Sequence, residues 1–194
     1  MVSKTRDKFI EVARQLFARK GVENTTMNDI ASASDKGRRT IYTYFKSKTD
    51  IFNAVIEHET GQILRELSII VAKQAPASEK LQDFIAARFQ AMQEIVKRNG
   101  SLRAGFFRDV RKVDRARKFI SRKEVAMLEE ILREGVECGE FNVPDLHKWA
   151  VLIDNALHGL DVPYIRDSLA EDGVPKDLLC SQLAQIILNG LISR

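Results

Sequence analysis

The sequence predicts an all-α protein in which a small N-terminal domain of three helices precedes a larger helical domain. Along nearly the whole chain of 194 residues, apolar side chains recur three or four positions apart, which is the spacing of one helix face. No segment shows the alternation of apolar and polar residues that is typical of a half-buried strand. Together these patterns indicate roughly eight to ten helices and no sheet.

The first fifty residues predict three short to medium helices. The first helix ends near Gly21. Thr26 is followed three positions later by Asp29, which resembles a capping box with Asp in place of Glu. We therefore expect a second helix over residues 27–34 and, after a short break, a third over residues 38–44. The apolar stripe of the first helix comprises Phe9, Ala13, Leu16 and Phe17.

The rest of the chain predicts longer helices. Ser47 and Asp50 are typical of a helix start, and apolar spacing continues from there to Ile70. Pro163 and the run Gly173-Val174-Pro175 are expected to interrupt the chain near its end. The further helices are expected over residues 81–99, 103–139, 144–160 and 179–191.

Positive charge is concentrated near the N-terminus. Residues 1–50 contain eleven Lys and Arg against six Asp and Glu, whereas residues 51–194 contain twenty against twenty-one. From Lys36 to Lys48, five residues are basic and none is acidic. A local positive field favours a phosphate backbone as partner, although a solvated basic turn has the same composition. We assign residues 1–48 to a DNA-binding domain and residues 49–194 to a second domain.

The second and third helices form a predicted helix-turn-helix, joined by a turn at Asp35-Lys36-Gly37. In this motif the second of the two helices enters the major groove with its N-terminal residues against base edges. That helix begins Arg38-Arg39-Thr40, side chains that can bond bases. Lys48, with the N-terminal N–H groups of the following helix, is expected to anchor a phosphate. Hydroxyl groups that can reach phosphates come from Tyr42, Thr43 and Tyr44.

Each of these residues also has a structural interpretation. Tyr42, Tyr44 and Phe45 can be core aromatics of a three-helix domain. Thr26 can be a helix cap alone, and the two arginines can be solvated surface. The combined pattern of residue type, spacing and order favours DNA binding over these separate explanations.

Two runs resemble the TetR family of bacterial repressors: Thr25 to Ala31, and Thr40 to Lys48. The resemblance covers roughly residues 5–60. Three positions depart from the family pattern: Asp35 and Lys36 in the turn, and Arg39, where a small residue is common and which argues for a distinct operator sequence. The DNA-contacting residues implied by the resemblance and by the basic segment are Thr26, Arg38, Arg39, Thr40, Tyr42, Thr43, Tyr44, Lys46 and Lys48.

The resemblance also implies that the larger domain pairs the chain into a homodimer and binds a small-molecule effector. The partners expected are therefore a palindromic double-stranded DNA operator, a second copy and an unidentified effector. An ordinary intramolecular core is the alternative reading of the last two apolar stripes. The expected dimer interface comprises Trp149, Ile153, Leu157, Leu160, Leu179, Leu183, Ile186 and Ile187.

The effector site is unknown from sequence, because spacing does not separate pocket residues from core. The side chains considered for a pocket are Phe84, Arg88, Phe89, Met92, Phe107, Trp149 and His158. Residues 97–123 contain eleven Lys and Arg against two Asp and Glu. A solvated basic face explains this segment best. The alternative is an anionic effector near Arg103, Arg108 and Arg111, with Phe106 and Phe107 as its apolar wall.

The sequence offers no motif for catalysis, a metal or a cofactor. His58, His147 and His158 are interpreted as isolated, and neither cysteine lies in a CxxC pair. Neither a leader peptide nor an apolar run of about 20 residues is found, so a cytoplasmic protein is expected. The function expected is a repressor, not an enzyme, released from its operator by an effector. A transcriptional activator, a non-specific DNA-binding protein, and a helical ligand carrier or enzyme retaining the motif are the alternatives.

Overall fold

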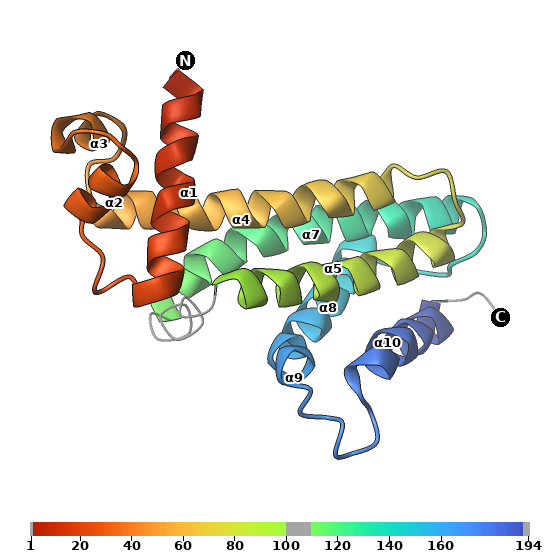
Figure 1. Ribbon diagram of the computed structural model, residues 1–194. Helices are drawn as coiled ribbons and strands as arrows, with labels where there is room; N and C mark the ends of the chain where they lie inside the picture. Colours follow the sequence, from red (N-terminus) through yellow and green to blue (C-terminus); the bar gives the residue numbers. More distant parts are fainter. Residues whose placement is uncertain (1, 100–109, 192–194) are drawn as a thin grey trace. The chain divides into compact units, whose positions relative to one another are not determined.

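A computed structural model of the chain describes the backbone of residues 2–99 and 110–191, and most side chains outside residues 96 and 98–119 (Figure 1). The described residues form helices and contain no β-strand, which confirms the predicted all-α class. None of the described helices combines the length and the apolar character needed to cross a membrane. The helices are α1 (Val2–Lys20), α2 (Met27–Ala33), α3 (Arg38–Tyr44), α4 (Lys48–Val71), α5 (Ala77–Asn99), α7 (Val110–Glu137), α8 (Leu146–Gly159), α9 (Asp161–Arg166) and α10 (Lys176–Leu191).

The chain divides into two compact units. The first comprises Met1–Gln62 and Ile95–Arg117, and the second comprises Ile63–Glu94 and Lys118–Arg194. The first unit extends beyond residue 48, the boundary expected from sequence, because the first turns of α4 contribute to its core. The α4 side chains buried there are Ile51, Phe52, Ala54 and Val55.

An aromatic and aliphatic core holds the first unit together. Phe9 and Phe17 of α1 are completely buried, as are Ile30 of α2 and Ile41 of α3. The rings of Phe9 and Phe45 meet edge to face, with centroids 6.5 Å apart. Each buried side chain of this size contributes about 1.5–3 kcal/mol relative to the exposed state. The core therefore determines which face of α3 points inward.

A capping box begins α2, as the sequence predicts. The Thr26 hydroxyl accepts a hydrogen bond from the Asp29 backbone N–H at 3.1 Å, and the Asp29 carboxylate accepts one from the Thr26 N–H at 2.8 Å. This second bond, reinforced by Lys20, lowers the pKa of Asp29 to about 2. Because the carboxyl group has its ordinary pKa in the unfolded chain, its stabilising effect is present near neutral pH and is lost as pH falls towards 2.

A close approach between helix and loop organises one end of the second unit. Gly135 lies near the end of α7, and a Cβ atom at that position would overlap the ring of Phe141. Phe141 is buried, and its backbone N–H donates to the Gly135 carbonyl at 3.0 Å. The ring therefore packs directly against the α7 backbone, which only glycine permits.

The helical chain is interrupted beside Pro163, as expected: α8 ends at Gly159, to whose carbonyl a proline at position 163 cannot donate, and α9 begins at Asp161. Pro163 is the third residue of α9, in the first helical turn. Proline is tolerated there because the N–H groups of the first turn have no partner within the helix. α9 ends at Arg166, and its C-cap residue Asp167 adopts the left-handed conformation with φ 53°.

We predict that Thr26→Ala lowers the free energy of unfolding by about 1 kcal/mol, because the Asp29 N–H loses its acceptor. Urea denaturation followed by circular dichroism measures the change. Thr49→Ala, at an exposed threonine in the first turn of α4, is the matched control and is expected to change stability by less than about 0.5 kcal/mol. Equal losses in both variants would contradict a specific capping role.

We predict that Gly135→Ala destabilises the protein by about 1–3 kcal/mol, although alanine is the better helix former. The added methyl group must displace the buried Phe141 ring. The double variant with Phe141→Leu tests the cause, since a smaller side chain there should recover part of the loss. A stabilised single variant would show that the ring moves aside freely.

Candidate functional site

The inner face of α3 is occupied by core residues. Ile41 is fully buried and Phe45 is 3% exposed. Tyr44 is half-buried, with its ring centroid 5.8 Å from that of Phe9. Tyr44 therefore packs against the core, as one of the two sequence interpretations proposed, and the DNA contact of its hydroxyl stays a prediction.

The outer face of α3 carries the residues expected to meet DNA. Since successive helical residues rotate by about 100°, a buried Ile41 directs Arg39 and Thr43 to the middle of the opposite face. Both are exposed. Arg38 and Tyr42 lie together on one flank, with the guanidinium carbon 5.9 Å from the centre of a ring that is 43% exposed.

Thr40 lies on the other flank of α3 and is half-buried. Its carbonyl accepts a hydrogen bond of 2.6 Å from the Thr43 hydroxyl. This local bond orients the Thr43 side chain along the helix and leaves its methyl group and both oxygen lone pairs for a partner. The exposed surface of α3 thus carries positive charge on one flank and at its centre, from Arg38 and Arg39, and a small hydroxyl side chain, Thr40, on the other flank.

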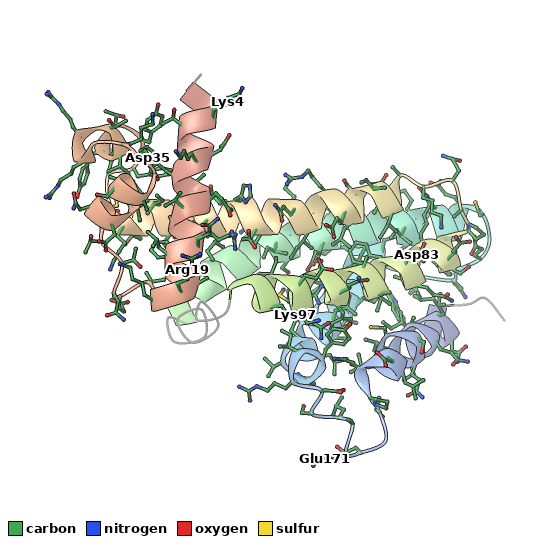
Figure 2. The ribbon with its side chains drawn as sticks, viewed as in Figure 1. Lys4, Arg19, Asp35, Asp83, Lys97 and Glu171 are labelled. Atoms are coloured by element: carbon green, nitrogen blue, oxygen red, sulfur yellow. The ribbon has the colours of Figure 1, made fainter. Side chains whose placement is uncertain are left out.

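The turn that precedes α3 has the geometry expected of its residues. Asp35, labelled in Figure 2, adopts the left-handed conformation with φ 55°. Its carboxylate lies 3.2 Å from the Lys8 ammonium. The Lys36 N–H donates to the Ala31 carbonyl at 3.0 Å, while the Lys36 side chain is exposed. The turn is therefore closed by its own backbone, and the charge of Lys36 remains at the surface.

Lys48 is placed differently from the other basic residues. Its ammonium donates to the carbonyls of Val22 at 2.8 Å and Glu23 at 3.2 Å. These bonds fasten the connection between α1 and α2 to the first turn of α4. An ammonium has three N–H groups, so a phosphate contact by Lys48 is limited to the third.

Lys46 has an exposed side chain beside the start of α4. Its backbone N–H donates to the Asp50 carboxylate at 2.9 Å, and Ser47 accepts from the Asp50 N–H at 3.1 Å. Asp50 is thereby used in the helix cap. Exposed, basic side chains thus extend from the turn to α4 through Lys36, Arg38, Arg39 and Lys46.

The expected dimer interface requires a correction. Ile153, Leu157 and Leu179 are at most 4% exposed within the single chain, so they do not face a second copy. Their stripes are wide, and the centre of each stripe faces the chain's own core. Among the eight residues Ile186 is the most open, at 69% exposed, while Trp149, Leu160, Leu183 and Ile187 are half-buried.

Sequence reasoning missed other apolar residues that face outward on the second unit. Leu152 of α8 is 64% exposed and Leu178 of α10 is 45% exposed. Each directly precedes a buried residue of the expected stripe, Ile153 and Leu179. Neighbouring residues on a helix differ by about 100° in direction, so only one member of each apolar pair can point into the core. The sequence shows both pairs, but it does not show which member is buried and which is exposed.

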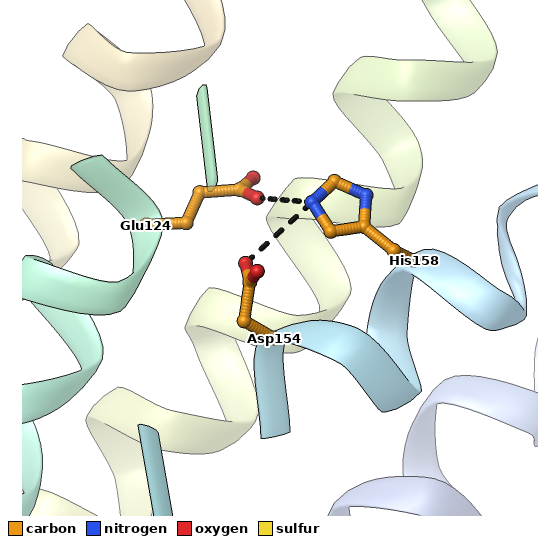
Figure 3. Close-up of side chains that lie close together, drawn as sticks. All are labelled: Glu124, Asp154 and His158. Carbon is orange, nitrogen blue, oxygen red and sulfur yellow. Dashed lines mark ion pairs between the residues drawn. The ribbon is translucent and has the colours of Figure 1, made fainter. Parts of the chain in front are cut away.

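Five charged or ionisable side chains cluster inside the second unit. Arg88 of α5 is 1% exposed. Its guanidinium bonds Glu124 of α7 at 3.0 Å and Asp161 of α9 at 2.6 Å, and lies 2.7 Å from Nδ1 of His158 on α8. Glu124 and Asp154 both approach His158 from its other side (Figure 3). The cluster joins four helices through hydrogen bonds and ion pairs.

The burial of these groups shifts their proton affinities. Burial alone would lower the pKa of His158, but the carboxylates of Asp161 and Glu124 raise it to about 9. Burial raises the pKa of Asp154 to about 6, against the opposing hydrogen bond from Ser121. Burial opposes the charge of Arg88 too, yet Glu124 and Asp161 hold its pKa above the ordinary value.

The expectation that His158 is isolated is wrong. Asp154 lies four residues before His158 and Asp161 lies three residues after it. At these spacings both carboxylates can reach the imidazole ring. This spacing, within an otherwise apolar segment, was the available signal. The contributions of Arg88 and Glu124 come from distant segments and had none. Among the described residues, Glu124, Asp154 and His158 each place one potential ligand atom within 4.8 Å of the others.

The residues considered for an effector site are either buried in the core or lie outside the side chains that the structure describes. Phe84 and Phe89, considered for an effector pocket, have no exposed surface and belong to the core. The residues proposed for an anionic effector lie outside the described side chains: Arg103, Phe106, Phe107, Arg108 and Arg111.

Comparison with known proteins identifies the N-terminal part of the chain. Residues 9–55 match the family model for "Bacterial regulatory proteins, tetR family". The "Probable acrEF/envCD operon repressor" of Escherichia coli (strain K12) is 39% identical in an alignment that covers 34% of this chain and 39% of that protein. The chain thus spans about two fifths of the length of the first curated relatives it matches.

Solved structures match over almost the full chain. A transcriptional regulator from Cytophaga hutchinsonii is 25% identical, with a TM-score of 0.76, and the match covers 96% of this chain and 98% of that one. A regulator from Saccharomonospora viridis, solved in complex with choline, has the same fold, with a TM-score of 0.72, 19% identity and coverage of 99% and 100%. The N-terminal domain of this chain, over residues 9–55, thus matches that of the tetR family of bacterial regulatory proteins.

Proposed function

We propose that the protein is a sequence-specific DNA-binding transcriptional regulator and acts as a repressor. The observation that carries this proposal is the outer face of α3, where Arg38, Arg39 and Thr43 are presented on a helix held by a buried core. The likeness to an operon repressor supports the direction of regulation. The same proposal holds that the protein acts in the cytoplasm and is not an enzyme.

The placement of side chains suggests a division of roles on DNA. Arg39 and Thr43 lie at the centre of the exposed face and are assigned to base edges, where arginine bonds guanine through two donors. Thr40 adjoins them. Arg38 and Tyr42 on the flank, with Thr26, Lys46 and Lys48, are assigned to phosphates and carry little sequence information.

We further propose that a second copy covers the exposed apolar residues of α8 and α10. These helices pack together in the chain, since a Cβ atom on Gly190 would lie 3.9 Å from the Trp149 ring. Leu152, Leu178 and Ile186 remain exposed beside this contact. A two-fold dimer contains two α3 helices, one for each half-site of a palindromic operator, and such half-sites lie about 34–36 Å apart.

Release by a small-molecule effector completes the proposal. The complex of the Saccharomonospora viridis regulator with choline shows that a protein of this fold holds a small molecule. We expect two conformations of the dimer that differ in the distance between their α3 helices. An effector changes DNA affinity only if it binds one of these conformations more tightly than the other. The identity of the effector is not part of the proposal.

Two α3-region variants test the division of roles. Arg39→Ala is expected to cost about 1–3 kcal/mol on the preferred operator and to relax the preference at one base position. Lys46→Ala is expected to weaken binding to every duplex alike and to reduce the salt dependence by about one phosphate contact. Selection from a random DNA pool, followed by titrations at several salt concentrations, measures both effects.

Arg166→Ala, at an exposed arginine of the second unit, is the matched control and should leave DNA binding unchanged. The assignment fails if Arg39→Ala and Lys46→Ala alter binding in the same way. A wild-type protein that selects no common sequence would instead favour the non-specific alternative. Lys48→Ala is less suitable, because it also removes the bonds to Val22 and Glu23.

The dimer is tested by Leu152→Glu and Ile186→Glu. Each is expected to convert the protein to a monomer at micromolar concentration in analytical ultracentrifugation, because a charge would have to be buried at the interface. Operator affinity should fall together with dimerisation. Ile69→Glu is the matched control, since Ile69 is an equally open residue, 72% exposed, on α4. A monomeric wild type, or a dimer that survives both changes, would refute this interface.

A further inference from the structure

We propose that Glu124, Asp154 and His158 bind one divalent transition-metal ion inside the second unit. This inference does not rest on the proposed DNA-binding function, since no residue of α2 or α3 takes part. It assigns a metal site where the sequence indicated none. The three residues come from two helices, α7 and α8, so the ion would link them.

The geometry places three ligand atoms around one point. Nε2 of His158 lies 3.2 Å from Oε2 of Glu124 and 3.6 Å from Oδ1 of Asp154. Figure 3 shows both carboxyl groups directed at the same ring nitrogen. Metal–ligand bonds of about 2.0–2.2 Å bring neighbouring ligand atoms to separations of about 3–3.5 Å. An ion is therefore accommodated with small side-chain adjustments.

The hydrogen-bonding state of these atoms is an independent observation. Oε2 of Glu124, Oδ1 of Asp154 and Nε2 of His158 are the buried side-chain atoms without a hydrogen-bond partner in the described part of the chain. Their side chains are 2%, 1% and 5% exposed, so water does not compensate from the surface. The short distances are those of ion pairs without hydrogen-bond alignment. Buried polar atoms are rarely left unpaired, and a single cation satisfies all three.

The remaining polar atom of each ligand is held by a neighbour. Arg88 donates to Oε1 of Glu124 at 3.0 Å, and Ser121 donates to Oδ2 of Asp154 at 2.5 Å. Nδ1 of His158 lies 3.1 Å from Oδ2 of Asp161. A carboxylate behind the imidazole is the usual support of a metal-bound histidine, because it fixes the ring and the proton on the distal nitrogen.

Arg88 retains its place in this arrangement. Its Nη2 lies 2.7 Å from Nδ1 of His158. In the metal-bound state Nδ1 carries the proton, so two N–H donors would face each other and this distance would lengthen. The guanidinium keeps its bonds to Glu124 and Asp161. With a neutral imidazole, one guanidinium faces three carboxylates, so a divalent ion brings the buried cluster to zero net charge.

The donor set indicates the class of ion. Two carboxylate oxygens and one imidazole nitrogen suit Zn²⁺, Mn²⁺, Fe²⁺ or Co²⁺, whereas Mg²⁺ and Ca²⁺ prefer oxygen ligands alone. Three protein ligands leave at least one coordination position for a water molecule or another small ligand.

The test uses the full-length protein without an affinity tag, dialysed against EDTA. Isothermal titration with ZnCl₂, MnCl₂ and CoCl₂ in separate experiments, and elemental analysis after gel filtration, are expected to give one tightly held ion per chain. MgCl₂ at the same concentration is expected to give none. Thermal unfolding should shift upward with the ion that binds. A wild-type chain that retains none of Zn²⁺, Mn²⁺ and Co²⁺ overturns the proposal.

Two variants locate the site, His158→Gln and Asp154→Asn, each close in size to the original residue. Each is expected to weaken binding at least about tenfold. His147→Gln is the matched control, because His147 also lies beside a carboxylate, Glu129, but at the surface. Binding that survives both cluster variants and is lost in the control places the ion elsewhere and overturns the assignment.

A spectroscopic measurement decides the question if the cluster variants fail to fold. The chain has three histidines, so the double variant His58→Gln and His147→Gln leaves His158 as the single imidazole. One equivalent of Zn²⁺ is expected to shift the Nε2 resonance of that ring and to leave its Nδ1 proton in place. Unchanged ring resonances at saturating Zn²⁺ overturn the proposal.

Discussion

The burial of one face of α3 is the constraint on which the DNA-facing surface depends. Ile41 and Phe45 are removed from water against Phe9, and a seven-residue helix has only one face left for solvent. Such a short helix is not stable by itself, since nucleation outweighs the few hydrogen bonds it gains. Tertiary packing therefore supplies both its stability and its rotation, and the rotation brings Arg39 and Thr43 to the centre of the exposed face.

Charge is used in opposite ways in the two units. Around α3 the basic side chains are exposed, and the nearby carboxylates of Asp35 and Asp50 are engaged with Lys8 and a helix cap. Those cations remain available to a phosphate backbone. In the second unit, Arg88 is enclosed with carboxylates that offset its desolvation. Removing one partner from such a cluster leaves an uncompensated buried charge, which is costly.

Much of the N-terminal motif was predictable because its signals are local. The Thr26 to Asp29 capping box needs only four consecutive residues. The left-handed turn at Asp35 needs one residue that tolerates the conformation. The capping box and the position of the turn were predicted correctly, as were the limits of α3. The status of Tyr44 was left open, because a partly polar aromatic suits either side of a short helix equally well.

The sequence by itself determined the helical class, the position of the helix-turn-helix and the segregation of positive charge, because each follows from periodicity or composition over a few turns. Only the tertiary structure decided which edge of a wide apolar stripe is buried, as between Leu152 and Ile153. It alone brought Arg88 and Glu124 to His158, from positions 70 and 34 residues away along the chain. Side-chain clusters of this kind depend on how separate helices pack, and spacing within one helix carries no information about residues on another.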